Sequence, residues 1–210
     1  MDRSSYVDAA RTALDLASTP EVRAAWDAES ACAGMSVGGL THHLLQQIVN
    51  SVRLLEAEPV EEQPIALLDH YARAAWVRAG LDDEANVTIR EESDAEAAHG
   101  TDHVLAVAKD ALERLPALLS APRAPDLVRI PWQGWSLATD DFLATRAMEL
   151  VVHGDDLAAS VGLQTPEFPE DVVAAVLALL SGVAVRRHGQ VAVVRALSRP
   201  QRAPDSVSAF

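Results

Sequence analysis

Apolar residues recur three and four positions apart along most of this chain of 210 residues, which is the spacing of an amphipathic helix. The clearest stretch runs from Val37 to about Ala57, where one face is apolar until Pro59 stops the pattern. Ser36 precedes this stretch, and we expect its hydroxyl to cap the first turn. The same period predicts helices over residues 4–16, 20–26, 64–79, 82–98, 102–115, 139–162 and 171–187, followed by a short segment over 191–197.

Capping and helix-breaking residues set the expected boundaries of these helices. Ser4 or Ser5 and Thr139 stand at helix starts, and their hydroxyl groups are suited to act as N-caps. Gly80 is expected to close the helix before it, because glycine readily adopts the left-handed conformation that follows many helices. Pro116 has no backbone N–H, and we expect it to interrupt the chain directly after Leu115.

Residues 127–137 are the most strand-like part of the chain, with a turn signal at Gln133-Gly134, and they predict a small β-ribbon or an irregular lid. The remaining pattern predicts an all-α protein, an antiparallel four-helix bundle with extra C-terminal helices. We expect residues 1–163 to form the bundle. Residues 164–210 are expected to pack on it as a helical extension rather than as a separate domain.

Composition and charge narrow the classes of function. A formal net charge of −14 argues against a nucleic-acid partner and against docking on anionic lipid, since both need a basic surface. No apolar run is long enough to span a membrane, and the N-terminus lacks the apolar core of a signal peptide. Cys32 is the single cysteine, so an internal disulfide is excluded. These features predict a cytoplasmic protein; its oligomeric state stays open and a homodimer is one option.

The candidate chemistry lies in the segment RAMELVVHGDDLA, where Glu149 and His153 are four residues apart in an apolar helix. That spacing places both side chains on one helix face, so a carboxylate and an imidazole can share one metal ion. His43, which follows Gly38 and Gly39 on the inner face of another predicted helix, can supply the third ligand. Two histidines and one glutamate would leave an open coordination position, which is typical of a catalytic site.

Two neighbours on the same face carry roles of their own. Arg146 is expected to fix Glu149 or an anionic substrate, and Asp156 to orient the His153 ring. A purely structural alternative pairs Arg146 with Glu149 and His153 with Asp156, with no metal at all.

Other residues offer competing interpretations. His42 is an adjacent alternative to His43, but it points about 100° away from the apolar face. His99 and His103, joined by His70, form a second and weaker candidate cluster. Cys32 is either a ligand or nucleophile, or a small packing residue.

Two motifs carry a resemblance to a known family. The segment SACAGMSVGGLTHHLLQQ, followed about a hundred residues later by FLATRAMELVVHGDDLAASVG, resembles the mycothiol-dependent maleylpyruvate isomerase family. That family is a branch of the DinB-like metal-dependent four-helix bundles, and the resemblance covers roughly residues 5–160.

The resemblance implies a specific chemistry. It implies a divalent ion, zinc before nickel or iron, held by His43, Glu149 and His153. It also implies mycothiol or a similar low-molecular-weight thiol as cosubstrate, activated at the metal for S-transfer or isomerisation. Two alternatives remain: a metal-dependent hydrolase of the same fold, or a helical bundle without enzymatic activity.

Overall fold

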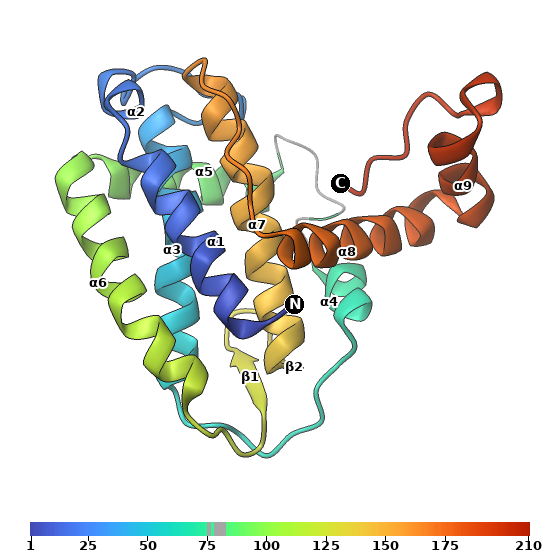
Figure 1. The fold of residues 1–210 in the computed structure, drawn as a ribbon, viewed down its shortest axis with the longest axis horizontal. Helices are drawn as coiled ribbons and strands as arrows, with labels where there is room; N and C mark the ends of the chain where they lie inside the picture. The colour runs from blue at the N-terminus through green and yellow to red at the C-terminus, as the bar shows by residue number, and fades with distance from the viewer. Residues whose placement is uncertain (75–76, 78–82) are drawn as a thin grey trace.

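The computed structural model describes residues 1–74, 77 and 83–210 of the chain. Four long helices form a bundle, in which α1 and α7 run in one direction and α3 and α6 in the other (Figure 1). The bundle helices are α1 (Arg3–Ala17), α3 (Val37–Glu56), α6 (Thr101–Ser120) and α7 (Thr139–Ser160). The predicted all-α four-helix architecture is confirmed.

Shorter helices complete the described part of the chain. They are α2 (Pro20–Ala24), α4 (Leu67–Arg73), α5 (Glu84–Ala97), α8 (Glu170–His188), α9 (Gln190–Ser198) and the 3₁₀ helix η2 (Pro200–Arg202). Helix α5 lies against α3, and α8 lies against α7 and then leads away from the bundle (Figure 1). The division between residues 1–163 and 164–210 as bundle and extension stays a prediction.

The core lies between the four bundle helices. Its largest fully buried side chains include Tyr6 on α1, Leu44 on α3, Leu115 on α6 and Phe142 on α7. The Tyr6 hydroxyl hydrogen-bonds the Ser51 hydroxyl at 2.7 Å, which satisfies a polar group that burial would otherwise penalise. The spaces between the helices are filled mainly by alanine, leucine and valine, as expected for a chain with few aromatic residues.

The predicted ribbon is present. Strands β1 (Leu127–Ile130) and β2 (Trp135–Ala138) pair antiparallel, with Ile130 opposite Trp135 and Leu127 opposite Ala138. Gly134 in the turn has φ of +84°, a conformation that favours glycine. The ribbon joins α6 to α7 at the end of the bundle where α3 and α6 finish and where α1 and α7 begin (Figure 1).

Two predicted N-caps are wrong by a few residues. Helix α1 is capped by the Asp2 carboxylate, which accepts the Ser4 backbone N–H at 2.9 Å. A negative carboxylate at this position is stabilised by the positive end of the helix dipole, so Asp2 takes the role predicted for Ser4 or Ser5. Thr139 is the first residue of α7 and not its cap, since β2 runs directly into the helix. The Thr139 N–H donates to the Asp126 carbonyl instead.

The predicted boundaries of two helices are also wrong. Helix α6 continues through Pro116 to Ser120. Burial of Leu119 against the bundle, one turn further on, stabilises the helix enough to offset the loss of the backbone hydrogen bond that proline cannot make. Helix α4 begins only at Leu67, since the Ile65 N–H donates to the Ser136 carbonyl and holds the preceding segment on the ribbon. The helix also ends at Arg73 rather than near residue 79, because Ala74 is extended; Gly80, the residue predicted to close it, lies outside the described residues.

None of the described helices is both long and apolar enough to cross a membrane.

Candidate metal centre

The three predicted donors come from two facing helices of the bundle. His43 projects from α3, and Glu149 and His153 project from adjacent turns of α7. The Glu149 Oε2 atom lies 3.1 Å from His153 Nε2 and 3.7 Å from His43 Nε2. The two imidazole rings meet edge to face, with centroids 4.8 Å apart. The fold therefore brings residue 43 beside two residues that follow it by more than a hundred positions.

The separations between these atoms fit a small divalent ion. One ligand atom from each of the three side chains lies within 4.8 Å of the other two. Donors about 2.0–2.1 Å from a tetrahedral zinc-like ion would stand roughly 3.3 Å from one another, and the observed 3.1 and 3.7 Å lie on either side of that value. The side chains are 13–21% exposed, so the group is sheltered without being sealed from solvent.

The start of α3 is held in place by close contacts that only glycine permits. Ser36 caps the helix as predicted, its hydroxyl accepting the Gly39 N–H at 2.9 Å and donating to Asp94 Oδ1 of α5. A Cβ atom on Gly39 would stand 2.1 Å from that same oxygen. One on Gly38 would stand 2.6 Å from the Trp26 ring. The two glycines thus let neighbouring segments pack tightly against the turn that precedes His43.

Asp156 lies on the far side of the His153 ring from Glu149. Its Oδ2 is 3.0 Å from His153 Nδ1, and this contact leaves Nε2 directed toward Glu149. A carboxylate in this position fixes the orientation of a metal-binding imidazole. The neighbouring Gly154 allows a second contact, because a Cβ there would stand 2.9 Å from the Phe168 ring.

Cys32 is a neighbour of the centre that the sequence did not place. Its Sγ donates to Asp156 Oδ2 at 3.4 Å, and Cys32, His153 and Asp156 form a second group with donor atoms within 4.8 Å. His153 belongs to both groups, through a different ring nitrogen in each. Nothing in the loop over residues 29–35 indicated the direction of this side chain, because an irregular segment has no periodicity.

Arg146 makes different contacts from those predicted. Its guanidinium donates to Gln47 Oε1 on α3 and to Thr145 Oγ1, and no Arg146–Glu149 salt bridge occurs within the described chain. Gln47 in turn donates to the His43 carbonyl at 2.8 Å. Of the two roles predicted for Arg146, direct pairing with Glu149 is therefore wrong, since a buried amide one turn beyond His43 offers the guanidinium an acceptor. Its contact with an anionic substrate stays a prediction. Gln47, a polar residue on an apolar face, was the available signal.

The charges of the centre compensate one another. Burial by itself would raise the pKa of the Glu149 carboxyl, but hydrogen bonds from His153 and His43, together with the Arg146 charge, lower it well below its usual value. Burial would lower the pKa of His153, yet contacts with Asp156, Cys32 and Glu149 raise it well above its usual value. Glu149 and His153 thus form a carboxylate–imidazolium pair when no ion separates them.

His70 lies apart from the weaker candidate cluster that the sequence also offered. It is buried on α4, where the Trp135 Nε1–H donates to its Nδ1 at 3.1 Å, so its proton resides on Nε2. Burial and the nearby Arg146 charge lower the pKa of His70 to about 4, and the imidazole is neutral. Its partners are thus the ribbon and Tyr71, with which it stacks edge to face. It does not join His99 and His103, and the alternative cluster of these three residues is wrong.

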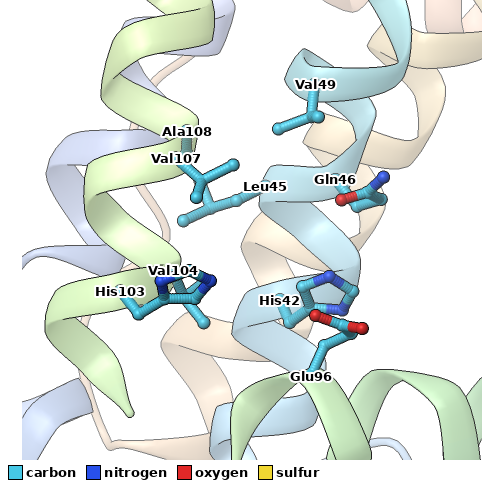
Figure 2. Close-up of a pocket in the computed structure, with 9 residues that line it drawn as sticks. All are labelled: His42, Leu45, Gln46, Val49, Glu96, His103, Val104, Val107 and Ala108. Atoms are coloured by element: carbon cyan, nitrogen blue, oxygen red, sulfur yellow. The ribbon is translucent and has the colours of Figure 1, made fainter. Parts of the chain in front are cut away.

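His42 points away from the candidate centre, as its position on the helix predicted. Figure 2 shows it in a separate cavity between α3, α5 and α6, beside Glu96 and opposite His103. This cavity holds about 70 Å³. Within residues 1–74, 77 and 83–210, just two three-residue groups of histidine, cysteine or carboxylate donors have all their ligand atoms within 4.8 Å, and neither includes His42.

Comparison with protein families shows to which family the bundle belongs. Residues 7–158 match the family of the mycothiol maleylpyruvate isomerase N-terminal domain. The chain belongs to this family. The matched range covers most of the bundle and includes His43, Glu149 and His153, as well as Arg146 and Asp156. No curated protein and no solved structure matches the chain.

Family membership adds a chemical context to the geometry. The family is named after the N-terminal domain of mycothiol maleylpyruvate isomerase, an enzyme whose name refers to a small thiol. The match ends before α8 begins, and the helices that follow lie outside the matched domain.

Proposed function

We propose that this protein is a metal-dependent enzyme that activates a low-molecular-weight thiol of the mycothiol type for S-transfer or isomerisation. The observation that carries the proposal is the convergence of His43, Glu149 and His153, whose donor atoms gather from α3 and α7 within 4.8 Å. Two features support the proposal. The name of the family refers to a small thiol, and the sheltered site offers the three donors that a catalytic metal ion needs.

In this proposal the three side chains hold one divalent ion, zinc before nickel or iron. The set of two imidazoles and one carboxylate suits all three metals and leaves room for a further ligand. When bound, the ion lowers the pKa of a thiol that enters this open position, so that the thiol reacts as a thiolate at neutral pH.

The remaining residues of the centre act by positioning these donors. Asp156 accepts the His153 Nδ1–H, which keeps Nε2 available as a donor atom. Arg146 holds the Gln47 amide, and Gln47 holds the His43 backbone, so Arg146 links the two helices that supply the ligands. The hydrogen bonds from His153 and His43, with a smaller contribution from the Arg146 charge, lower the pKa of Glu149 and favour the ionised form that binds a cation.

Metal analysis and a thiol titration together test the proposal. After extensive dialysis the protein is expected to retain close to one equivalent of a divalent ion. Less than about a tenth of an equivalent would show that the centre is structural. In the cobalt-substituted protein, added mycothiol is expected to change the visible absorption spectrum, whereas its oxygen analogue should not. A spectrum unchanged by mycothiol would reject the thiol role and favour the hydrolase alternative.

The contact between Asp156 and His153 gives a graded prediction. Replacing Asp156 by asparagine keeps the size of the side chain but weakens its acceptance of the Nδ1–H, and the affinity for zinc is expected to fall by about 10–100-fold. Competition with a coloured chelator measures this change. Asp155→Asn serves as the matched control, because Asp155 is exposed and contacts Thr165 instead. Equal affinities for the two variants would contradict the positioning role.

A further inference from the structure

Helix α9 presents its apolar face to solvent. Val191, Val194 and Leu197 are spaced three residues apart and therefore share one face, and they are 60%, 54% and 76% exposed. Val193 is the one α9 residue buried on the opposite side. A helix that packs only on its own domain turns its apolar stripe inward, so an outward stripe indicates a surface that another molecule covers.

This exposed helix is held at the end of a defined structure. Figure 1 shows α8 leading away from the bundle, with α9 at its far end. The second half of α8 packs through Gly182 against Leu68 of α4, and Arg186 pairs with Asp69 at 2.7 Å. The chain then turns back, and its last residue, Phe210, packs against the Tyr71 ring. The apolar face of α9 is thus kept apart from the bundle by these contacts.

The same segment has a charge opposite to that of the bundle. We name residues 172–204 the C-terminal arm. The arm contains five arginines and no acidic residue, whereas residues 1–171 contain 30 acidic residues against 12 lysines and arginines. Arg195 and Arg199 flank the exposed apolar residues of α9, and both are themselves exposed. An apolar stripe with a basic rim is complementary to a surface that is rich in carboxylates.

We propose that the C-terminal arm docks on the acidic bundle of a second copy of this chain and thereby forms a homodimer. The bundle supplies the negative charge that the arm lacks, and one pairing of two copies lets both arms dock. An anionic membrane or a nucleic acid would attract the arm but repel the strongly acidic bundle that carries it. This proposal is independent of the metal centre, because the arm lies outside the family match and the docking argument uses no metal ligand.

The mass in solution tests the proposal directly. Size-exclusion chromatography with light scattering is expected to give twice the mass of one chain for residues 1–210. The double variant Val194→Asp with Leu197→Asp is expected to give the mass of one chain, with self-association weakened about 100-fold or more. Val60→Asp is the matched control, since Val60 is an exposed valine outside the arm, and it should remain dimeric. If residues 1–210 stay monomeric as their concentration rises, the proposal is overturned.

The basic rim allows a second test that does not touch the apolar face. The variant Arg195→Glu with Arg199→Glu alters exposed side chains and should keep the helical circular dichroism of the parent protein. Its self-association is expected to weaken at least about tenfold, and added salt should weaken the parent in the same direction. If both arm variants remain fully dimeric, the contact lies elsewhere and the proposal fails. It also fails if the parent is monomeric and sediments with phosphatidylglycerol vesicles.

Discussion

Replacing His43 by alanine is expected to abolish retention of the divalent ion, whereas replacing the adjacent His42 should leave the ion in place. Both residues lie on α3, but His43 Nε2 is 3.7 Å from Glu149 Oε2, while His42 lines a different cavity. Loss of one of three protein ligands is expected to weaken zinc binding by about 1,000-fold, or about 4 kcal/mol. Elemental analysis of dialysed protein measures the retained ion for each variant.

The neighbouring variant makes this comparison unusually well controlled. His42→Ala removes the same type of side chain from the same helix, and its Nδ1 is buried without a hydrogen-bond partner, so little is lost. Circular dichroism establishes that both variants keep their helices. If His42→Ala strips the ion and His43→Ala keeps it, the assignment of His43 is wrong. His103→Ala, on the other wall of the His42 cavity, should also retain the ion.

In the metal-free protein, Glu149→Ala is expected to lower the free energy of unfolding by about 1–3 kcal/mol. The Glu149 side chain is 13% exposed and lies 3.1 Å from His153, whose charged form it stabilises. Removing the carboxylate leaves His153 Nε2 without its partner beside a cavity, while Nδ1 keeps its contact with Asp156. Urea unfolding, followed by circular dichroism in the presence of a chelator, measures the change.

Two further variants separate this charge effect from the loss of a side chain. Glu96→Ala removes an exposed glutamate that lies beside His42, and its cost should stay within about 1 kcal/mol. The double variant Glu149→Leu with His153→Leu replaces both charges by apolar groups and should be more stable than Glu149→Ala. Should Glu149→Ala cost no more than Glu96→Ala, the pair contributes nothing to the stability of the metal-free fold.

Local sequence patterns were sufficient for most of the helices. The apolar period, the Ser36 cap and Pro59 fixed α3 to within a residue, and the turn at Gly134 located the ribbon. These signals act over one or two turns of chain, so they need no tertiary context. The end of α6 was predicted wrongly at Pro116 because burial of Leu119 outweighed a local preference, whereas the cap of α1 was wrong because Asp2, a neighbouring candidate, takes that role.

Some contacts of the candidate centre were likewise predictable from local sequence, and others were not. Glu149, His153 and Asp156 lie on one helix, and helical spacing alone places them side by side. The position of His43 beside them was inferred from its place on an apolar face, and the structure places it there; its role as a ligand stays a prediction. The Gln47–Arg146 contact and the direction of Cys32 were not accessible from spacing, because they join segments about 100 or more residues apart.

The sequence by itself determined which faces are apolar and which polar residues those faces carry. It also determined that the negative charge of the chain is concentrated in the bundle. Only the tertiary structure decided which polar residues meet across the bundle and which apolar face is left exposed, as it is on α9. The physical reason is that periodicity fixes the direction of a side chain relative to its own helix axis. The partner that it meets depends on how the helices pack, and packing is set by the whole core at once.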